Sequence, residues 1–228
     1  MTLPTDLARP IGAPFDAVVF DLDGTLIDTE SLCNEAGVEA CANLGLPVDM
    51  AFFESLAGID DRTRARLIGE HVGATLEVEG FFAEWDRLCS ERFAQGIPLK
   101  AGALDLMGRL RAMGIPMAIA TSSRAGPAGE KITAAGLMPF LRTVVTVDDV
   151  AAPKPAPDAY LLAVERLGAD PSRALAFEDS ETGARAAHAA GLTVVQVPDL
   201  HGTLGAHAHH VAATLIEGAV AAGLIDAG

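Results

Sequence analysis

The sequence predicts an α/β fold in which an all-helical domain interrupts a core built on a parallel sheet. Residues 16–21 form a short apolar run with two valines, which is typical of a buried parallel strand. Residues 29–98 then show helical spacing of apolar positions and no strand-like run. After Pro98 helical segments alternate with short apolar strands, and this alternation indicates βαβ units in a Rossmann-like sheet.

The N-terminal part predicts an irregular leader, one strand and four helices. The leader covers residues 1–15 and precedes the first strand. Gly45 is a plausible end for the first helix, and turn residues such as Gly58 and Gly80 separate the later ones. We expect these helices near 29–44, 49–57, 61–71 and 80–95.

The C-terminal part predicts the rest of the core. Helices are expected at 103–113, 126–136, 157–167 and 181–190, and strands at 116–120, 143–147, 175–177 and 193–197. A last apolar piece near 210–216 adds an edge strand or a helix. We therefore predict that residues 1–28 and 99–228 form the core domain and that residues 29–98 form the helical domain.

The composition makes several classes of partner unfavourable. Thirty-one acidic residues against sixteen basic ones give a net charge of -15, which repels nucleic acid and anionic membranes. No apolar run approaches the roughly 20 residues of a spanning helix, and the leader lacks the apolar segment of a secretory signal. The three cysteines, Cys33, Cys41 and Cys89, lack close spacing and suit a reducing compartment. We expect a cytoplasmic protein with neither nucleic-acid nor membrane partners, and its oligomeric state stays open.

Two carboxylates follow the first strand. Asp21 and Asp23 are two residues apart, with Gly24 and Thr25 behind them. Open α/β sheets bind ligands at the carboxyl ends of their strands, so both acids are candidates for chemistry. A capped strand-to-helix turn explains one acid and the glycine but not the second acid.

Hydroxyl groups follow the strand predicted at 116–120. Thr121 and Ser122 begin a segment that opens toward a helix, and a hydroxyl with such backbone amides can hold a phosphate. Helix capping is the alternative role for these hydroxyls. Arg124 is a candidate substrate contact or a solvated arginine at the start of a helix.

Lys154 lies between Pro153 and Pro155, and we expect the two prolines to hold it in extended backbone. An ammonium group ordered in this way suits the neutralisation of a carboxylate and a phosphoryl oxygen. A surface lysine in a proline-rich loop is the alternative reading.

A second pair of acids, Glu178 and Asp179, follows the strand predicted at 175–177. Two acid pairs at one edge of a sheet would repel each other unless a hard cation lies between them. Oxygen ligands with room for water and a phosphate oxygen favour Mg²⁺. An acidic helix cap explains Asp179 but not both acids together with Gly183.

In chain order, these four stretches resemble the four motifs of the haloacid dehalogenase-like phosphohydrolases. The Asp-x-Asp-Gly-Thr stretch that begins at Asp21 matches motif I, and Thr121 matches the hydroxyl of motif II. Lys-Pro-x-Pro-Asp from Lys154 matches motif III, and Glu-Asp-Ser-x-x-Gly from Glu178 matches motif IV. The helical insertion is similar to the cap of the β-phosphoglucomutase-like, CbbY-type subgroup.

The resemblance implies a role for each matched residue. Asp21 would be the nucleophile that forms an aspartyl-phosphate, and Asp23 would protonate the leaving oxygen and then activate water. Thr121 and Lys154 would hold the phosphoryl oxygens, with Ser122 beside them. The dehalogenases of this superfamily share the nucleophile but need neither the second acid nor a metal, so Asp23 favours phosphate chemistry.

The resemblance also implies the ligands of the metal. Asp21, the backbone carbonyl of Asp23 and Asp179 would bind Mg²⁺, with Glu178 as a direct or an outer-shell ligand. The expected activity is Mg²⁺-dependent hydrolysis of a small phosphorylated metabolite such as a sugar phosphate.

Two other functions remain as alternatives. β-Phosphoglucomutase carries a cap arginine for a second phosphate, and Asp61 stands at that position here, beside Arg62 and Arg64. A hydrolase is therefore preferred over a phosphosugar mutase. A non-catalytic metabolite-binding protein is the more distant alternative, and the intact motif residues argue against it. The histidines between His201 and His210 lie in a Gly-rich loop whose spacing favours solvated side chains over a zinc site.

Overall fold

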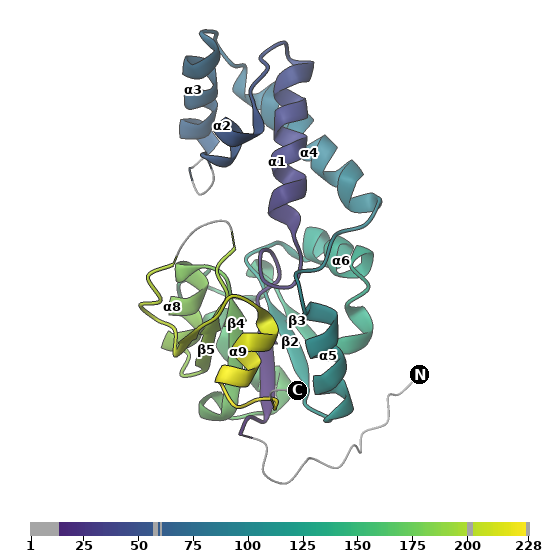
Figure 1. Ribbon diagram of the computed structural model, residues 1–228, viewed down its shortest axis with the longest axis vertical. Helices are drawn as coiled ribbons and strands as arrows, with labels where there is room; N and C mark the ends of the chain where they lie inside the picture. The colour runs from purple at the N-terminus through teal and green to yellow at the C-terminus, as the bar shows by residue number, and fades with distance from the viewer. Residues whose placement is uncertain (1–13, 57–58, 60, 200–202, 227–228) are drawn as a thin grey trace. The chain divides into compact units, whose positions relative to one another are not determined.

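The computed structural model of the chain describes residues 14–56, 59, 61–199 and 203–226. The chain divides into two compact units, which are coloured by residue number in Figure 1. The helical unit is the segment Asp28–Ile97, and the core unit combines the chain before Asp28 with the chain from Pro98 onward.

A parallel sheet of six strands forms the centre of the core unit. In chain order the strands are β1 (Ala17–Phe20), β2 (Met117–Ala120), β3 (Thr143–Val145), β4 (Ala174–Glu178), β5 (Thr193–Gln196) and β6 (His210–Val211). Their spatial order is β3-β2-β1-β4-β5-β6, and every neighbouring pair is parallel. The carboxyl ends of all the strands therefore lie at one edge. The order in which strands are added to the sheet reverses between β1 and β4, and such sheets bind ligands at this point.

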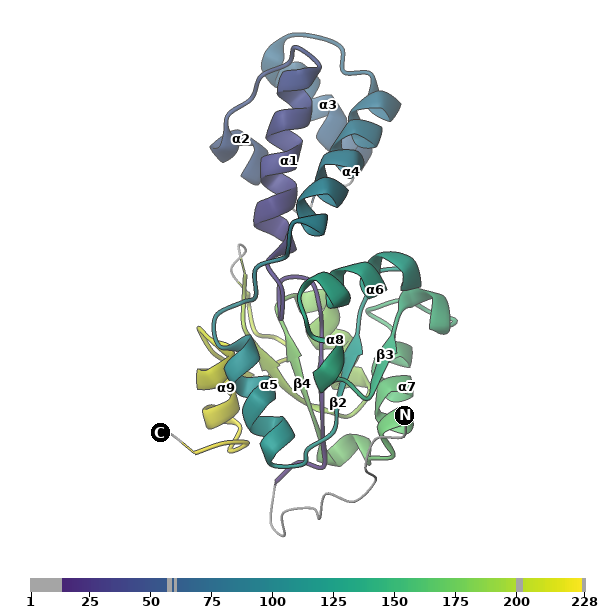
Figure 2. The same ribbon diagram turned by 90° about the vertical axis from the view of Figure 1, so that its right-hand side faces the viewer.

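Helices cover the sheet on its two faces. The helices of the core unit are α5 (Ala103–Ala112), α6 (Ala125–Ala134), α7 (Asp158–Leu167), α8 (Glu181–Ala189) and α9 (Leu215–Ala221). α7 and α8 pack against the strands through an alanine-rich cluster of buried residues. α5 and α9 contact each other and lie together in Figure 2. The small side chains allow these helices to approach the strands closely, which explains the high alanine content.

The central strand β1 is buried on both faces. All four of its residues are fully buried, and Phe20 stacks on Phe177 of β4 with ring centroids 5.2 Å apart. The backbone N–H of Asp21 donates to the carbonyl of Phe177 at 2.9 Å, which continues the pairing of β1 with β4. Two apolar strands thus fix the position at which the first acid leaves the sheet.

The helical unit consists of α1 (Thr29–Asn43), α2 (Met50–Glu54), α3 (Asp61–Val72) and α4 (Val78–Ala94). Carboxylates cap three of these helices: Asp28 accepts from Ser31 N–H, Asp49 from Phe52 N–H, and Glu77 from two backbone N–H groups. α1 and α4 pack together around aromatic side chains that include Phe53 and Trp85, whose rings meet edge to face. The unit therefore has its own hydrophobic core.

The predicted fold class is confirmed, because all five strands expected from the sequence are present. The apolar piece at 210–216 contains both β6 and the start of α9. Lys154 and Pro155 lie in a turn in which the Ala156 N–H donates to the Pro153 carbonyl at 2.9 Å, and the peptide bond between them is cis. Within the described ranges, no helix combines the length and the apolar character that crossing a membrane requires.

Candidate active site

Four acids leave the sheet next to one another, at the ends of β1 and β4. Asp21 and Asp23 follow β1, while Glu178 is the last residue of β4 and Asp179 is the next residue. Gly24 turns the chain away from β1 with a φ of +83°, and a Cβ at this position would lie 2.6 Å from Oδ2 of Asp179. Glycine is therefore required both by the backbone conformation and by the close approach of the second acid pair.

Lys154 connects the two acid pairs. Its ammonium lies 2.6 Å from Oδ1 of Asp21 and 2.6 Å from Oε1 of Glu178. The lysine side chain is 4% exposed and that of Glu178 is fully buried. A buried charge with two opposite charges in contact is held far more rigidly than a surface ion pair.

Tyr160 of α7 is a further member of this cluster that was not predicted from the sequence. The phenol is fully buried and donates to Oε1 of Glu178 at 2.6 Å, and it lies 3.3 Å from the Lys154 ammonium. The other oxygen of Glu178 accepts from the backbone N–H and the hydroxyl of Ser180, at 3.4 and 3.2 Å. Both oxygens of Glu178 are therefore engaged by protein donors.

Burial and charge shift the pKa values of this cluster. Burial raises the pKa of the Asp21 carboxyl well above its usual range, and the charges of Glu178 and Asp179 add to this effect, against the opposing effect of Lys154. Burial would lower the pKa of the Lys154 ammonium, but Asp21 and Glu178 outweigh it and raise that pKa. The lysine therefore stays charged, and more positive charge is needed to hold all three carboxylates ionised.

The hydroxyl motif lies at the carboxyl end of β2, next to β1. Thr121 is 2% exposed, and its hydroxyl oxygen accepts from the Ser123 backbone N–H at 3.0 Å. Because this contact uses the oxygen as an acceptor, the Thr121 O–H remains able to donate to a ligand. Ser122 and Ser123 continue the same loop toward α6.

Lys131 of α6 also lies at this edge, and it was not predicted from the sequence. Its ammonium is 2.7 Å from Oδ1 of Asp23, and the Ser123 hydroxyl donates to Oδ2 of Asp23 at 2.9 Å. The sequence contains three lysines, and the third, Lys100, is paired with Asp199. Each lysine of this acidic chain thus pairs with a carboxylate. The scarcity of lysine in the sequence is the signal that could have drawn attention to Lys131.

A cavity of about 330 Å³ joins these groups. It is lined by Asp21, Asp23, Thr121, Ser122, Ser123, Lys154, Asp179, Ser180, Thr182 and Gly183. The volume suits a small ligand, and the lining contains carboxylates, hydroxyls and one ammonium. Arg124 is exposed at the N-cap of α6 and does not line this cavity. Glu178 lies behind the cavity wall, where Gly183 separates it from the open space.

Three of the acids form a candidate metal centre. One oxygen from each of Asp21, Glu178 and Asp179 lies within 4.8 Å of the others, and the described part of the chain contains no other such group. Thr25 donates to Oδ1 of Asp179 at 3.3 Å and so orients that carboxylate. An all-oxygen donor set next to a raised carboxyl pKa fits a hard divalent cation.

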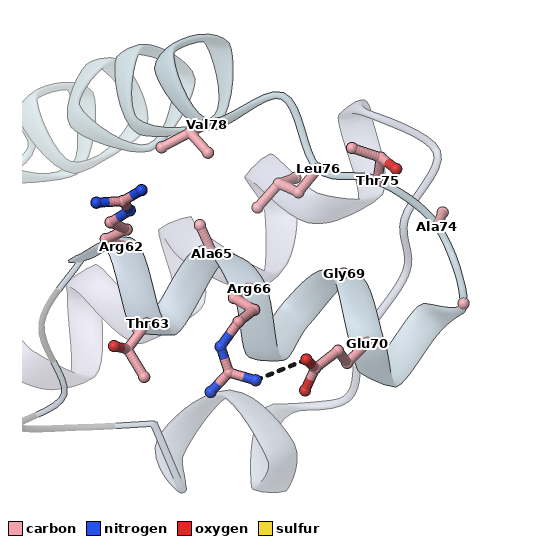
Figure 3. Close-up of a pocket in the computed structure, with 11 residues that line it drawn as sticks. Arg62, Thr63, Ala65, Arg66, Gly69, Glu70, Ala74, Thr75, Leu76 and Val78 are labelled. Carbon is pink, nitrogen blue, oxygen red and sulfur yellow. Dashed lines mark hydrogen bonds and ion pairs between the residues drawn. The ribbon is translucent and has the colours of Figure 1, made fainter.

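A second hollow, of about 860 Å³, lies in the helical unit (Figure 3). Gly69 and Leu76 are among its lining residues, and so are Arg66 and Glu70, which form an ion pair at 2.6 Å (Figure 3). Of its two arginines, Arg62 lines the hollow without an acid partner in the described structure. Its lining holds a single carboxylate, Glu70, and none of the four matched motifs, all of which lie in the core unit.

The predicted cap residues have different environments. Arg64 lies over the ring of Trp85 at 4.9 Å and donates to the Leu56 carbonyl at 3.3 Å, so it has a structural role. The side chain of Asp61 lies outside the described residues, as do Gly58 and Asp60. The sequence argument about the missing cap arginine therefore stays a prediction.

The histidines of the C-terminal loop gather near α8. The rings of His188 and His209 stack with centroids 5.5 Å apart, and His207 lies 6.0 Å from His188. Among the described residues they do not form a metal-binding group. His201 lies outside the described residues.

Comparison with known proteins adds independent findings. The family model for haloacid dehalogenase-like hydrolases matches residues 15–191. The validoxylamine A 7'-phosphate phosphatase of Streptomyces hygroscopicus subsp. limoneus is 32% identical, over 82% of this chain and 87% of that protein. The fructose-1-phosphate phosphatase YqaB of Escherichia coli strain K12 is 31% identical, over 80% of this chain and 96% of that protein.

A solved structure shows the same architecture. CbbY from Rhodobacter sphaeroides, in complex with phosphate, superposes with a TM-score of 0.67 at 30% identity, over 88% of this chain and 94% of that chain. The matched part includes both the core unit and the helical unit, since neither unit alone accounts for this coverage.

Proposed function

Because the chain belongs to the haloacid dehalogenase-like hydrolases, we propose that it hydrolyses a phosphomonoester of a small metabolite. The observation that carries the proposal is the single cavity in which Asp21 and Asp23 face Thr121 and Lys154. Two relatives are named for phosphorylated substrates, one of them a sugar phosphate, and they support a sugar phosphate as the substrate here.

The residues divide the reaction into two displacements. An oxygen of Asp21 attacks phosphorus, the bond from phosphorus to the ester oxygen breaks, and Asp23 gives its proton to that oxygen. Water then attacks the aspartyl-phosphate, gives a proton to Asp23 and releases inorganic phosphate from Asp21. The Lys154 ammonium and the Thr121 hydroxyl hold the phosphoryl oxygens during both steps, so catalysis relies on positioning and charge.

The three-acid group would hold Mg²⁺ through Asp21 and Asp179, with the backbone carbonyl of Asp23 as a further ligand. Both oxygens of Glu178 already accept from protein donors, so we assign Glu178 to the outer shell, where it steers Lys154. When bound, the ion would supply positive charge that stabilises the transferring phosphoryl group and keeps Asp21 ionised.

The test is phosphate release from a panel of sugar phosphates and other small phosphomonoesters, with Mg²⁺ and again with EDTA. We expect release that depends on Mg²⁺ and disappears in Asp21→Asn, whose circular dichroism should match that of the unmutated protein. Substantial activity in purified Asp21→Asn would contradict the nucleophile assignment.

The same panel separates the alternatives. β-Glucose 1-phosphate is included, and formation of glucose 6-phosphate is followed in parallel. Isomerisation without net phosphate release would identify a mutase and refute the argument from Asp61. Tight binding of a phosphorylated metabolite without any turnover would identify a non-catalytic binding protein.

A further inference from the structure

Asp23 is held by two donors of different kinds. The Lys131 ammonium lies 2.7 Å from Oδ1, and the Ser123 hydroxyl lies 2.9 Å from Oδ2. The same ammonium is 3.3 Å from the Ser123 oxygen, so the three groups form a closed triangle. Each oxygen of this carboxylate therefore has a partner of its own, and the rotation of the carboxylate is restricted on both sides.

The two partners lie on different sides of the cavity wall. Ser123 lines the cavity together with Asp23, whereas Lys131 is absent from that lining. Oδ2 is therefore bound by a residue of the cavity lining, and Oδ1 by a residue outside that lining. A hydroxyl such as that of Ser123 can turn toward another acceptor, but an ammonium at an ion-pair distance is a stronger anchor.

The fold directs Lys131 toward Asp23. Ala128 and Ile132 are fully buried on the inner face of α6, and Lys131 stands between them on that face. The carboxylate of Asp148 accepts from the Ala125 N–H at 3.0 Å and so fixes the start of the helix. The Lys131 side chain is only 15% exposed, which is unlike a solvated helix lysine.

We propose that Lys131 is a positioning residue for proton transfer: it holds Oδ1 of Asp23 so that Oδ2 meets the oxygen of the leaving group. This role rests on the proposed phosphomonoesterase function. In the first displacement the proton on Oδ2 passes to the ester oxygen as its bond to phosphorus breaks, and an alcohol leaves. In the second, the attacking water returns a proton to the same oxygen.

A leaving-group comparison tests this role. An alkyl phosphate needs its departing oxygen protonated, whereas p-nitrophenyl phosphate releases a stable anion and depends little on an acid. The value of kcat/KM covers the steps up to the loss of the leaving group, so it reports the first displacement. The measurement is kcat/KM for both esters, with Mg²⁺, in the unmutated protein, Lys131→Met, Lys131→Arg and Asp23→Asn.

We expect Lys131→Met to lower kcat/KM for the alkyl ester by about 10-fold or more, a part of the 10²–10⁴-fold that an acid supplies. The loss for p-nitrophenyl phosphate should stay below about 3-fold. Lys131→Arg should recover most of the loss because it restores the cation, and Asp23→Asn should show the same selectivity with a larger loss. Arg142→Met removes an exposed cation from the same unit and should change neither value.

Each other result has a defined meaning. An equal loss for both esters, or a loss that arginine does not recover, would show that Lys131 is merely structural. No loss in Lys131→Met would also overturn its role while leaving the proposed function intact. A lack of phosphate release from both esters in the unmutated protein would refute the proposed function itself, and the role of Lys131 with it.

Discussion

At the scale of single residues, the pairing of Lys154 with Asp21 and Glu178 bears on how the buried carboxylate of Asp21 could act as the proposed nucleophile. A buried acid tends to keep its proton, and its neighbours Glu178 and Asp179 strengthen that tendency. Lys154 opposes it from 2.6 Å and is itself held by Glu178 and Tyr160. One ammonium cannot balance the charge of three carboxylates, and this imbalance supports the proposed divalent cation.

Gly183 gives a test of this arrangement. A Cβ at this position would lie 1.8 Å from Oε1 of Glu178, whose side chain is fully buried and engaged by Lys154, Tyr160 and Ser180. Gly183→Ala should therefore displace Glu178 and destabilise the protein by about 1–3 kcal/mol, as overpacking does. Activity should fall by more than about 10-fold at temperatures where the variant is folded, because the Lys154 ammonium loses its second anchor.

Gly108→Ala is the matched control. Gly108 lies inside α5, and nothing lies within 4 Å of the Cβ that alanine would add. This variant should be more stable by about 0.5–1 kcal/mol through helix propensity alone. The measurements are thermal unfolding and phosphate release for both variants and for the unmutated protein. Equal activities in Gly183→Ala and the unmutated protein would show that Glu178 does not control Lys154.

The sequence predicted the acids and Lys154 far better than their partners. Asp21 and Glu178 follow apolar strands, and a parallel sheet brings strand ends together whatever the details of packing. Lys131 and Tyr160 lie on helices, where their direction depends on how α6 and α7 rotate against the sheet. That rotation is set by tertiary packing, which has no local signature, so these two contacts required the structure.

At the scale of elements, the strands could be predicted because each is a short apolar run between turns, with no competing helical period. The edge of the sheet was harder. β6 is two residues long, and it pairs with β5 after a loop that carries several histidines. Its place is fixed by contacts from that loop: the His209 N–H donates to the Val194 carbonyl at 2.8 Å, and its Nδ1 accepts from the Val194 N–H at 3.0 Å.

These contacts make the stability of the edge depend on pH. Burial lowers the pKa of His209, and the neighbouring His188 and His210 lower it further. The stabilisation from neutral His209 is complete above the pKa of histidine in the unfolded chain, about 6.5. It is lost as the pH falls below that value, because the unfolded chain takes up the proton more readily than the folded one. His209→Asn keeps an acceptor near the Val194 N–H and cannot titrate in this range. As the pH is lowered from about 7.5 to about 5.5, the melting temperature of the unmutated protein should therefore decrease relative to that of this variant.

The comparison between variants removes the effects that acidification has on the many carboxylates. His188→Asn takes away one of the two charges that face His209, so it should make the pH dependence of the melting temperature shallower. A difference between the unmutated protein and His209→Asn that does not change with pH would contradict the role given to this histidine.

At the scale of the whole molecule, the four motifs were sufficient for the superfamily to be predicted, and the match over residues 15–191 confirms it. The similarity to CbbY bears out the subgroup. A hydrolase of this superfamily is thus established, whereas the side chains of the helical unit have no recognisable pattern that would name a substrate. The motifs are readable because chemistry fixes their residue types, and the helical unit is constrained mainly to have a hydrophobic core.

With a net charge of -15, the chain could be stabilised by Mg²⁺ either over its whole acidic surface or at one site. We predict that Mg²⁺ stabilises the folded chain by binding the three-acid group of Asp21, Glu178 and Asp179. An ion that binds the folded state alone, at one hundred times its Kd, adds about 2.7 kcal/mol of stability, or roughly 5–10 °C in a protein of this size. Asp179→Asn removes one ligand and one charge from the three-acid group, so the rise in melting temperature should largely disappear. NaCl at equal ionic strength measures the stabilisation that comes from screening. If Mg²⁺ raised both melting temperatures equally, it would be acting on the acidic surface, and the ends of β1 and β4 would not be its binding site.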